Sequence, residues 1–568
     1  MTPPCAAYAL APAGSLSWAG FSFFLALLTL ASLLTTPRTW AAPVAPDAPA
    51  NASSAAAASP AKLNLPAFYI QEFRVDNSGK LLSRDEIEAA VYPFLGPYRT
   101  AADVEQARAA LEQAYHDKGY QTVSVMIPRQ PRSPIIHLQV SLGEIGRLRV
   151  VGSRYFSIEE IRREAPSLEE GQSPNFSQVQ QDLVALNQSA DRRITPTVRP
   201  GEIPGTVDVD LTVKDTFPLH GSVELNNRYS ANTTALRVNA SVSYDNLWQL
   251  GHAIGFSFQT SPQDTNQGQV YSGYYLARIP GIDWLSLMAQ GTYQDSAVNT
   301  LGGIGVVGKG KILGGRAIFN LPQLTNYYHS LSLGIDYKHF DQDLMIAGSP
   351  SVSPITYFPF SAAYSGSWIN RSAQDVTKVV SETDLNASAN FSIREIDGSE
   401  QQFDTNRSGS DGGYIYFRGD LSHTHDLPGG FQLFAKLQGQ AADKPLISSE
   451  QFSAGGLGTV RGYLESEELG DNGLIETLEM RSPSLGDFLG KAVDDWRFYV
   501  FGDAAQLTID DALPGQQEKF KLASVGLGTR VKLQDHYNGS FDIGLPLDNG
   551  PNTAAYEPLM TFRIWAEF

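Results

Sequence analysis

The residues with the clearest capacity for chemistry lie in a glycine-rich stretch near the C-terminal end, FSAGGLGTVRGYLESEELGDNG at residues 452–473. Its single basic side chain is Arg461, and its four acids are Glu465, Glu467, Glu468 and Asp471. An arginine binds a carboxylate through two parallel hydrogen bonds, so Arg461 is a candidate for a fixed ion pair. The acids lack the spacing of calcium-loop ligands, which favours a solvated acidic loop.

The sequence lacks the motifs of common enzymes. It contains no G-x-S-x-G, no H-E-x-x-H and no complete phosphate-binding loop, so we expect no enzymatic activity and no cofactor. His423 and His425 share one face of an expected strand. Two histidines without a third ligand are more typical of surface residues than of a metal site, so no metal is expected. The only cysteine is Cys5, which excludes an internal disulfide.

Composition favours a β-rich protein. The net charge is −18, which argues against a nucleic-acid partner. Charged residues make up 18% of the chain, while glycine and tyrosine are plentiful, with 51 and 24 copies. Soluble domains usually contain roughly 25% charged residues. The 568 residues are too many for one compact core, so two or more domains are expected.

The N-terminal region is typical of a secreted protein. The apolar run Phe21–Leu34 is shorter than the roughly 20 residues of a membrane-spanning helix, and it is typical of a signal peptide. We expect cleavage after Ala41, giving a signal peptide at 1–41. The first basic residue is Arg38, so the usual positive start is missing, and an uncleaved anchor is the alternative. Residues 42–66 are rich in alanine and proline and predict a linker.

Two similar α+β units follow, each with the order β-α-α-β-β. The first is expected at 67–143 and the second at 144–215. A serine followed three residues later by a glutamate predicts a capping box at Ser83–Glu86 and another at Ser157–Glu160. Each unit has an edge strand, which can add an extended peptide as a further strand. Two unremarkable small domains are the alternative interpretation.

From residue 216 to the end, apolar and polar residues alternate through many segments. In HSLSLGIDYKH, for example, Leu331, Leu333 and Ile335 alternate with small or polar residues. The pattern predicts strands with one apolar face. Charges on the other face and aromatic residues near segment ends favour an outer-membrane barrel over a soluble sandwich. At about 22 residues per strand and connection, 216–568 predicts about 16 antiparallel strands. The last strand carries Phe562, Ile564 and Phe568 on one face, a candidate barrel signal.

The order of these parts resembles the outer-membrane transporters of two-partner secretion, the TpsB or ShlB/FhaC-like proteins of the Omp85 superfamily. The small units resemble POTRA domains. The motif Val460-Arg461-Gly462-Tyr463 resembles the family's VRGY motif, which lies on a loop folded back into the barrel. Phe501, Asp503 and Ala505 resemble its F-x-D-x-G strand motif, with alanine in place of the usual glycine. The resemblance implies that Arg461 pairs with Asp503 on the inner wall.

The resemblance also implies a function. It predicts a pore that recognises a partner exoprotein through the POTRA domains and passes it unfolded to the cell surface without ATP. The exoprotein would resemble TpsA proteins and carry an N-terminal secretion domain. An Omp85-type factor that assembles or inserts outer-membrane proteins is the alternative. The other expected partners are outer-membrane lipid and the barrel assembly machinery during biogenesis. The protein is expected as a monomer in the outer membrane of a Gram-negative bacterium, with the POTRA domains in the periplasm. The short segment before the first POTRA domain shows no amphipathic pattern, which argues against a plug helix.

Overall fold

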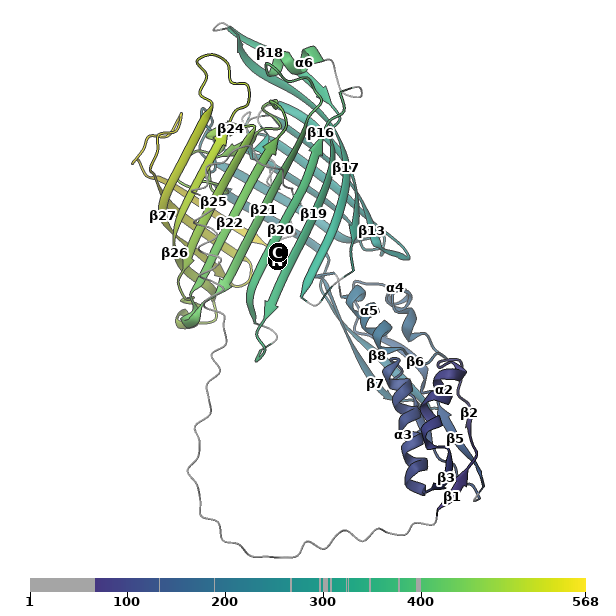
Figure 1. Cartoon of the computed structure of the whole chain (residues 1–568). Coiled ribbons are helices and arrows are strands. Elements are labelled where there is room, and N and C mark those ends of the chain that lie inside the picture. Colours follow the sequence, from purple (N-terminus) through teal and green to yellow (C-terminus); the bar gives the residue numbers. More distant parts are fainter. Residues whose placement is uncertain are drawn as a thin grey trace, which may run out of the picture. The chain divides into compact units, whose positions relative to one another are not determined.

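The computed structural model describes residues 67–568, apart from 132, 188, 266–267, 296–297, 300–304, 307–308, 323, 325, 347–348, 376–377 and 395–399. The signal peptide expected at 1–41, the linker at 42–66 and any plug helix before the first repeat lie outside the described residues. The described chain forms two compact units, one ending at Asp215 and the other running from Thr216 to Phe568 (Figure 1).

The first unit contains two small α+β repeats. The first repeat contains β1 (Phe68–Ile70), β2 (Glu72–Asp76), α2 (Arg84–Val91), η1 (Tyr92–Phe94), β3 (Gly96–Arg99), α3 (Ala101–Asp117), β4 (Ser124–Met126) and β5 (Ile135–Ser141). The second contains β6 (Glu144–Val151), α4 (Ile158–Arg163), η2 (Pro166–Leu168), α5 (Phe176–Leu186), β7 (Arg192–Pro200) and β8 (Thr206–Asp215). Their three-stranded sheets have the orders β2-β5-β4 and β6-β8-β7, so the last strand of each repeat is central. The predicted β-α-α-β-β order therefore occurs twice, with a short β1–β3 pair added to the first repeat.

Apolar residues at helical and strand spacing form one core in each repeat. In the first, Leu111 and Tyr115 of α3 are buried with Leu138 of β5. In the second, Ile161 of α4 is buried with Leu211 of β8. Separate cores explain why each repeat reads as a domain in the sequence.

The first helix of each repeat begins differently. At α2 the predicted capping box is formed: Ser83 N donates to the Glu86 carboxylate at 2.7 Å, and Glu86 N donates to Ser83 Oγ at 3.3 Å. The Lys118 ammonium also donates to Glu86 at 2.8 Å. These donors, with Lys118 the largest cause, lower the pKa of Glu86 to about 2.

The box predicted at Ser157 and Glu160 is wrong. Helix α4 begins after Ser157 without a side-chain cap bond. Glu160 instead forms an ion pair with Arg163, one helical turn later. An i,i+3 ion pair on the helix surface competes for the same carboxylate, which the serine-to-glutamate spacing alone does not reveal.

The second unit is a barrel of antiparallel strands (Figure 1). Its wall is formed by β9 (Leu219–Asn226), β10 (Arg237–Leu247), β11 (His252–Thr260), β12 (Val270–Ile279), β13 (Ile282–Asp295), β16 (Lys309–Asn320), β17 (Tyr327–Ile346), β18 (Ser349–Tyr357), β19 (Phe360–Arg371), β20 (Val379–Phe391), β21 (Ile415–Asp426), β22 (Gln432–Ala442), β25 (Asn472–Arg481), β26 (Val493–Thr508), β27 (Lys519–Leu533), β28 (Tyr537–Pro546) and β29 (Leu559–Glu567). The connections contain β14 (Val298–Asn299), β15 (Gly305–Val306), β23 (Phe452–Ala454), β24 (Glu468–Gly470), α6 (Glu400–Asn406), η3 (Pro428–Gly430) and α7 (Gly486–Leu489).

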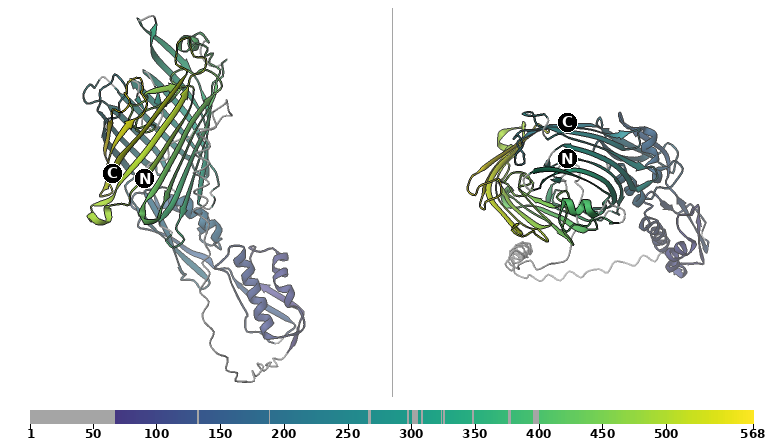
Figure 2. Two further views of the ribbon diagram at one scale, coloured as in Figure 1. Left: turned by 60° about the vertical axis from the view of Figure 1, so that its left-hand side comes forward. Right: turned by 90° about the horizontal axis from the view of Figure 1, so that it is seen from above.

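The wall has sixteen positions in the described chain, which confirms the expected strand number. One half of β17, residues 338–346, pairs with β18, and the other half, residues 327–335, pairs with β19. β18 and β19 therefore act as two parts of one wall strand, separated by Phe358 and Pro359. The proline lacks a backbone N–H and interrupts the ladder where the two parts meet. Figure 2 shows the tilted strands of the wall from a second side and from above.

The two faces of the wall differ in polarity as the alternation predicted. On β17, Leu333 and Ile335 are 46% and 45% exposed on the outer surface. The next residue, Asp336, faces the other way and is 8% exposed. Exposed aromatic residues lie near strand ends, including Trp248 and Trp284. An apolar outer band with aromatic ends is typical of a transmembrane barrel.

The barrel closes between its last and first strands. β29 pairs with β9 over five positions, from Arg563–Asn226 to Glu567–Ser222. Arg563 donates to both carboxylate oxygens of Glu224 across this junction, at 3.1 and 2.7 Å. The C-terminal Phe568 exchanges two backbone hydrogen bonds with Gly221, each of 3.0 Å. No helix among the described residues is long and apolar enough to cross a membrane.

Candidate functional site

The loop that joins β22 to β25, residues 443–471, turns inward; we call it the inner loop. It contains the hairpin of β23 and β24 (Figure 1). Val460, Arg461 and Tyr463 of this loop are 0%, 4% and 1% exposed. The glycine-rich stretch is therefore a packed segment rather than a free surface loop.

Arg461 binds the wall through Asp503 of β26. Its Nε and Nη2 donate to the two carboxylate oxygens of Asp503 at 2.8 and 3.0 Å, and its backbone N donates at 3.1 Å. Pairing of β26 with both neighbours runs without a bulge through Asp503, so this side chain faces the lumen, opposite the exposed Val500. The contact that the family resemblance implied is present as a two-pronged, buried ion pair.

Other wall residues extend this ion pair into a cluster. Arg461 Nη1 donates to Glu479 of β25 at 2.7 Å and lies 3.6 Å from Asp542 of β28. Glu479 also accepts from Arg481 at 2.7 Å and from Arg530 of β27 at 3.4 Å. We call the six residues the Arg461 cluster: Arg461, Arg481, Arg530, Glu479, Asp503 and Asp542. Its three guanidinium groups and three carboxylates balance in charge, which offsets part of the cost of burying them.

An aromatic ring and an apolar cluster surround the charges. The guanidinium carbon of Arg461 lies 3.5 Å from the centre of the Phe501 ring, a cation–π contact. Ala505 is 7% exposed and belongs to an apolar cluster with Val460 and Tyr463. The methyl group that replaces the usual glycine of the family motif is thus packed against the loop motif.

Gly462 and Tyr463 fix the loop to other strands. Gly462 has φ +90°, a left-handed conformation that favours glycine, and it lies against Gly544 of β28. A Cβ added to Gly544 would lie 2.5 Å from Gly462 N. The Tyr463 hydroxyl has one proton to donate and lies 2.7 Å from Asp548 O and 3.0 Å from Ala523 O. Each residue of the VRGY motif therefore has its own contact with the wall or its loops.

The prediction that the acids of this stretch form a solvated loop is wrong for three of the four, and Glu468 is partly exposed. Glu465, Glu467 and Asp471 are 5%, 6% and 0% exposed. Glu465 accepts from Arg228 at 2.7 Å, and Asp471 accepts from the backbone of Leu446 at 2.9 Å. These three acids are buried because basic side chains and backbone N–H groups from other segments meet them, and those partners are distant in sequence.

Several site residues were not found from the sequence. Glu479, Asp542 and Gly544 belong to ordinary alternating strands and carry no motif of their own. Their lumenal side could have been read from the period of two, since Glu479 alternates with the apolar Leu478 and Met480. The register that brings them to Arg461 could not be read this way.

The remaining predicted residues lie elsewhere on the barrel. Ile564 and Phe568 are 60% and 66% exposed on the outer face of β29 and just after it, and Phe562 N donates to Asn227 at 2.7 Å at the closing junction. The His423 and His425 rings stack at 5.9 Å, and His423 bonds the Thr383 hydroxyl at 2.7 Å. In the described chain these histidines belong to no group of three possible metal ligands.

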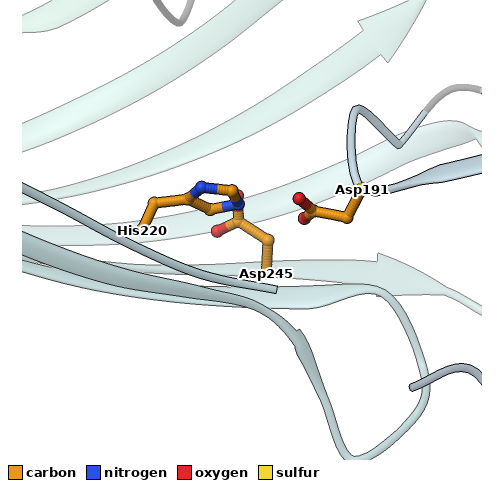
Figure 3. Close-up of side chains that lie close together, drawn as sticks. All are labelled: Asp191, His220 and Asp245. Carbon is orange, nitrogen blue, oxygen red and sulfur yellow. The ribbon is translucent and has the colours of Figure 1, made fainter. Parts of the chain in front are cut away.

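A histidine and an acid lie side by side on the first two wall strands. His220 Nε2 of β9 is 3.9 Å from Asp245 Oδ2 of β10 (Figure 3). Figure 3 also draws Asp191, which belongs to the other unit. Two ligands from the barrel are fewer than the three or four that protein metal sites use.

The chain matches known families over most of this architecture. Residues 68–143 match the POTRA domain family of ShlB type. Residues 205–342 and 376–531, just over half of the chain, match the haemolysin secretion/activation protein family ShlB/FhaC/HecB. The chain belongs to this family. Its members are transporters rather than enzymes. In this family the barrel lies in the outer membrane and the POTRA domains lie in the periplasm.

Individual relatives agree with this assignment. The outer membrane transporter CdiB of Dickeya dadantii is 23% identical over 442 residues, covering 72% of this chain and 71% of CdiB. The heme/hemopexin transporter protein HuxB of Haemophilus influenzae is 20% identical over 503 residues, covering 84% of each chain. The structure of CdiB from Escherichia coli aligns with a TM-score of 0.62 at 18% identity, covering 98% of this chain and 100% of that structure.

The Omp85 superfamily likeness is one of fold. BamA from Haemophilus ducreyi, lacking POTRA domains 1–3, aligns with a TM-score of 0.53 at 16% identity, covering 88% of this chain and 100% of that structure. At this low identity, the structural alignment supports only a shared architecture of barrel and preceding domain.

The close approach of Gly462 to Gly544 gives a first prediction. We expect Gly544→Ala to displace the VRGY segment, because the added methyl group meets backbone atoms that cannot rotate away. The measurement is protease cleavage of the inner loop in the purified, folded protein, which should accelerate in the variant. Gly502→Ala on β26 is the matched control, since no atom lies within 4 Å of its added Cβ. Equal cleavage of the two variants would contradict the tight contact.

Proposed function

We propose that this protein is an outer-membrane pore that binds one partner exoprotein in the periplasm through its POTRA domains and passes it unfolded to the cell surface. Membership of the haemolysin secretion/activation family and the similarity to CdiB and HuxB support secretion. Each of these relatives is a transporter by its own description. The exoprotein would carry the N-terminal secretion domain that the POTRA domains recognise.

The observation that carries the proposal is the inner loop bound to the lumenal wall by Arg461. A protein chain that passes through the barrel must share the lumen with this loop. Polar contacts hold the loop, including the Arg461–Asp503 pair and the Tyr463 hydrogen bonds. Such contacts can exchange with water or with the backbone of a passing chain.

The proposed transport needs no nucleotide. The sequence contains no complete phosphate-binding loop. Folding of the exoprotein outside the cell would bury apolar surface and make return through the pore unfavourable. The direction of transport would therefore follow from the difference in folding between the two sides.

Recognition by strand addition is proposed at β4, one of the two edge strands of the first POTRA sheet. Its outward backbone groups at Val125 are already bonded: Val125 N donates to Glu112 at 2.9 Å, and Val125 O accepts from Arg108 at 3.1 Å. Arg108 and Glu112 also pair with each other at 2.8 Å. An incoming strand must therefore displace this pair from the edge, which would favour a specific partner over a random extended peptide.

The edge strand β7 of the second POTRA sheet is less suited to strand addition. The Asn187 side chain bonds both Ile194 N, at 2.6 Å, and Ile194 O, at 3.0 Å. Pro196 and Pro200 are two and six residues after Ile194, so their backbones face the same edge as Ile194. As prolines they have no N–H to donate there. An apolar groove lies beside this strand, lined by Val179 of α5 among others. We propose that the second repeat contributes side-chain contacts rather than a strand edge.

The edge pair of the first repeat gives a prediction. Arg108→Ala/Glu112→Ala frees the backbone groups of Val125, so the full-length protein in detergent should bind the N-terminal region of its exoprotein more tightly. Two hydrogen bonds at about 1 kcal/mol each would lower Kd by up to roughly thirtyfold. The matched control is Arg84→Ala/Glu88→Ala, another i,i+4 ion pair, on the exposed face of α2. Unchanged affinity in the first variant would rule out β4 as the site of addition.

The Arg461 cluster gives a second prediction for this function. Removing one partner of a buried ion pair costs about 3–5 kcal/mol, so Arg461→Ala should release the loop motif and strongly reduce secretion of the exoprotein. Secreted exoprotein and outer-membrane levels of the variant are measured together by immunoblot. Lys532→Ala is the control, a wall cation whose described ion pair is with Asp535. Normal secretion by folded Arg461→Ala would refute the proposed role.

An Omp85-type assembly factor is the second candidate, because the BamA alignment shares the fold. The two functions differ in what depends on the protein. Deleting the gene and comparing outer-membrane and secreted proteins by mass spectrometry separates them. Loss of one exoprotein supports two-partner secretion, and loss of many barrels supports an assembly factor.

A further inference from the structure

The inner loop has a second buried attachment, centred on Glu450. Glu450 is 2% exposed. Its carboxylate accepts from Lys338 of β17 at 2.5 Å, from the Tyr357 hydroxyl of β18 at 2.5 Å and from the Tyr416 hydroxyl of β21 at 2.7 Å. Three strands thus bind one side chain of the loop.

Apolar packing strengthens this attachment. Leu446 and Ile447, just before Glu450, are both 0% exposed. They are buried with Phe340 of β17, Phe403 of α6 and other aromatic residues of the same region. Residues 446–450, which we call the first arm of the inner loop, are therefore packed as a protein core is, with the charged Glu450 among them.

The backbone of the first arm is also held. Arg418 of β21 donates to Glu450 O at 3.1 Å, and Gln440 of β22 donates to the same oxygen at 3.2 Å. Gln440 also donates to Asp471 O at 3.0 Å, at the other end of the loop. Gln440 thus holds two points of the inner loop, at Glu450 and at Asp471.

The two attachments lie on different sectors of the wall. Glu450 contacts β17, β18 and β21, whereas the Arg461 cluster lies on β25, β26, β27 and β28. With β18 and β19 counted as one position, β28 is eight positions from β17 in the ring of sixteen. Eight positions is the largest separation that such a ring allows, whereas the nearest strands of the two attachments, β21 and β25, are two positions apart. The inner loop is therefore tied to both sides of the strands from which it arises.

We propose that Glu450 is a second anchor of the inner loop, a positioning residue that keeps the loop across the lumen and the resting pore closed. The proposal rests on the secretion function above, because a passing exoprotein must then release this anchor as well as Arg461. Glu450 is suited to this role because its bonds are with a lysine and two tyrosines, all polar groups that water can satisfy once the loop moves.

The test measures ion flow through the full-length protein in planar lipid bilayers. Glu450→Gln keeps the size of the side chain and removes the charge that Lys338 and the tyrosines bind. We expect the frequency of channel opening to rise at least about tenfold, which corresponds to about 1.4 kcal/mol at 25 °C. Glu382→Gln is the matched control: the same substitution at an exposed lumenal position of β20. Its opening frequency should stay at the wild-type level.

A second variant and a rescue keep the test decisive. Lys338→Met leaves the loop sequence unchanged and should raise the opening frequency in the same way. Restoring an ion pair with Lys338→Glu/Glu450→Lys should lower the frequency again, which a merely destabilised barrel would not do. Heat-dependent gel mobility identifies folded barrels, and only these are recorded. Unchanged opening in folded Glu450→Gln or folded Lys338→Met overturns the anchor.

The outcome is separable from that of the proposed function. Ion flow through the empty pore requires no exoprotein, so the bilayer measurement reports the anchor alone. Secretion of the exoprotein by the wild-type protein reports the transport function alone. A closed wild-type pore that opens in Glu450→Gln supports the anchor even in a protein whose partner differs from the one proposed.

Discussion

A buried guanidinium group determines much of the organisation of this barrel. Arg461 comes from a loop, yet it is enclosed on a wall, where an unpaired charge would be very costly. The cost is met only when Asp503, Glu479 and Asp542 converge on it from β26, β25 and β28. A shift of one residue in the pairing of any of these strands would turn its carboxylate to the outer surface. The position of the loop and the register of the wall therefore depend on each other.

The same dependence sets limits on side-chain size around the charges. Gly462 meets Gly544 through their backbones, so both positions must lack a side chain for the guanidinium to reach its carboxylates. Ala505 shows that the limit is local, because its methyl group lies in an apolar cluster with Val460 instead of between backbones. Glycine is thus dispensable at position 505 but required at positions 462 and 544.

The sequence predicted the parts that depend on local patterns. Period-two alternation at Leu333 and Ile335 identified strands and their outer face, and the Ser83–Glu86 spacing identified a helix start. The parts it missed depend on pairing between distant strands. Nothing near Glu450 in the sequence shows that Lys338 and Tyr416 will meet it, and the acids at Glu465 and Asp471 looked solvated because their partners lie elsewhere in the chain. The contact between Arg461 and Asp503 was expected only through resemblance to a family.

The polar contacts of the loop bear on its release during the proposed transport. The apolar residues that the loop buries around Leu446 and Val460 would be exposed to water on release, at about 25 cal/mol for each Å². Buried ion pairs behave differently, since the desolvation they suffer when closed nearly balances their attraction, and both partners regain water when they separate. The clusters at Arg461 and Glu450 place such pairs on opposite sides of the loop's origin. When the loop leaves, the vacated carboxylates face a polar lumen and not lipid, so the charged groups add little to the cost of release.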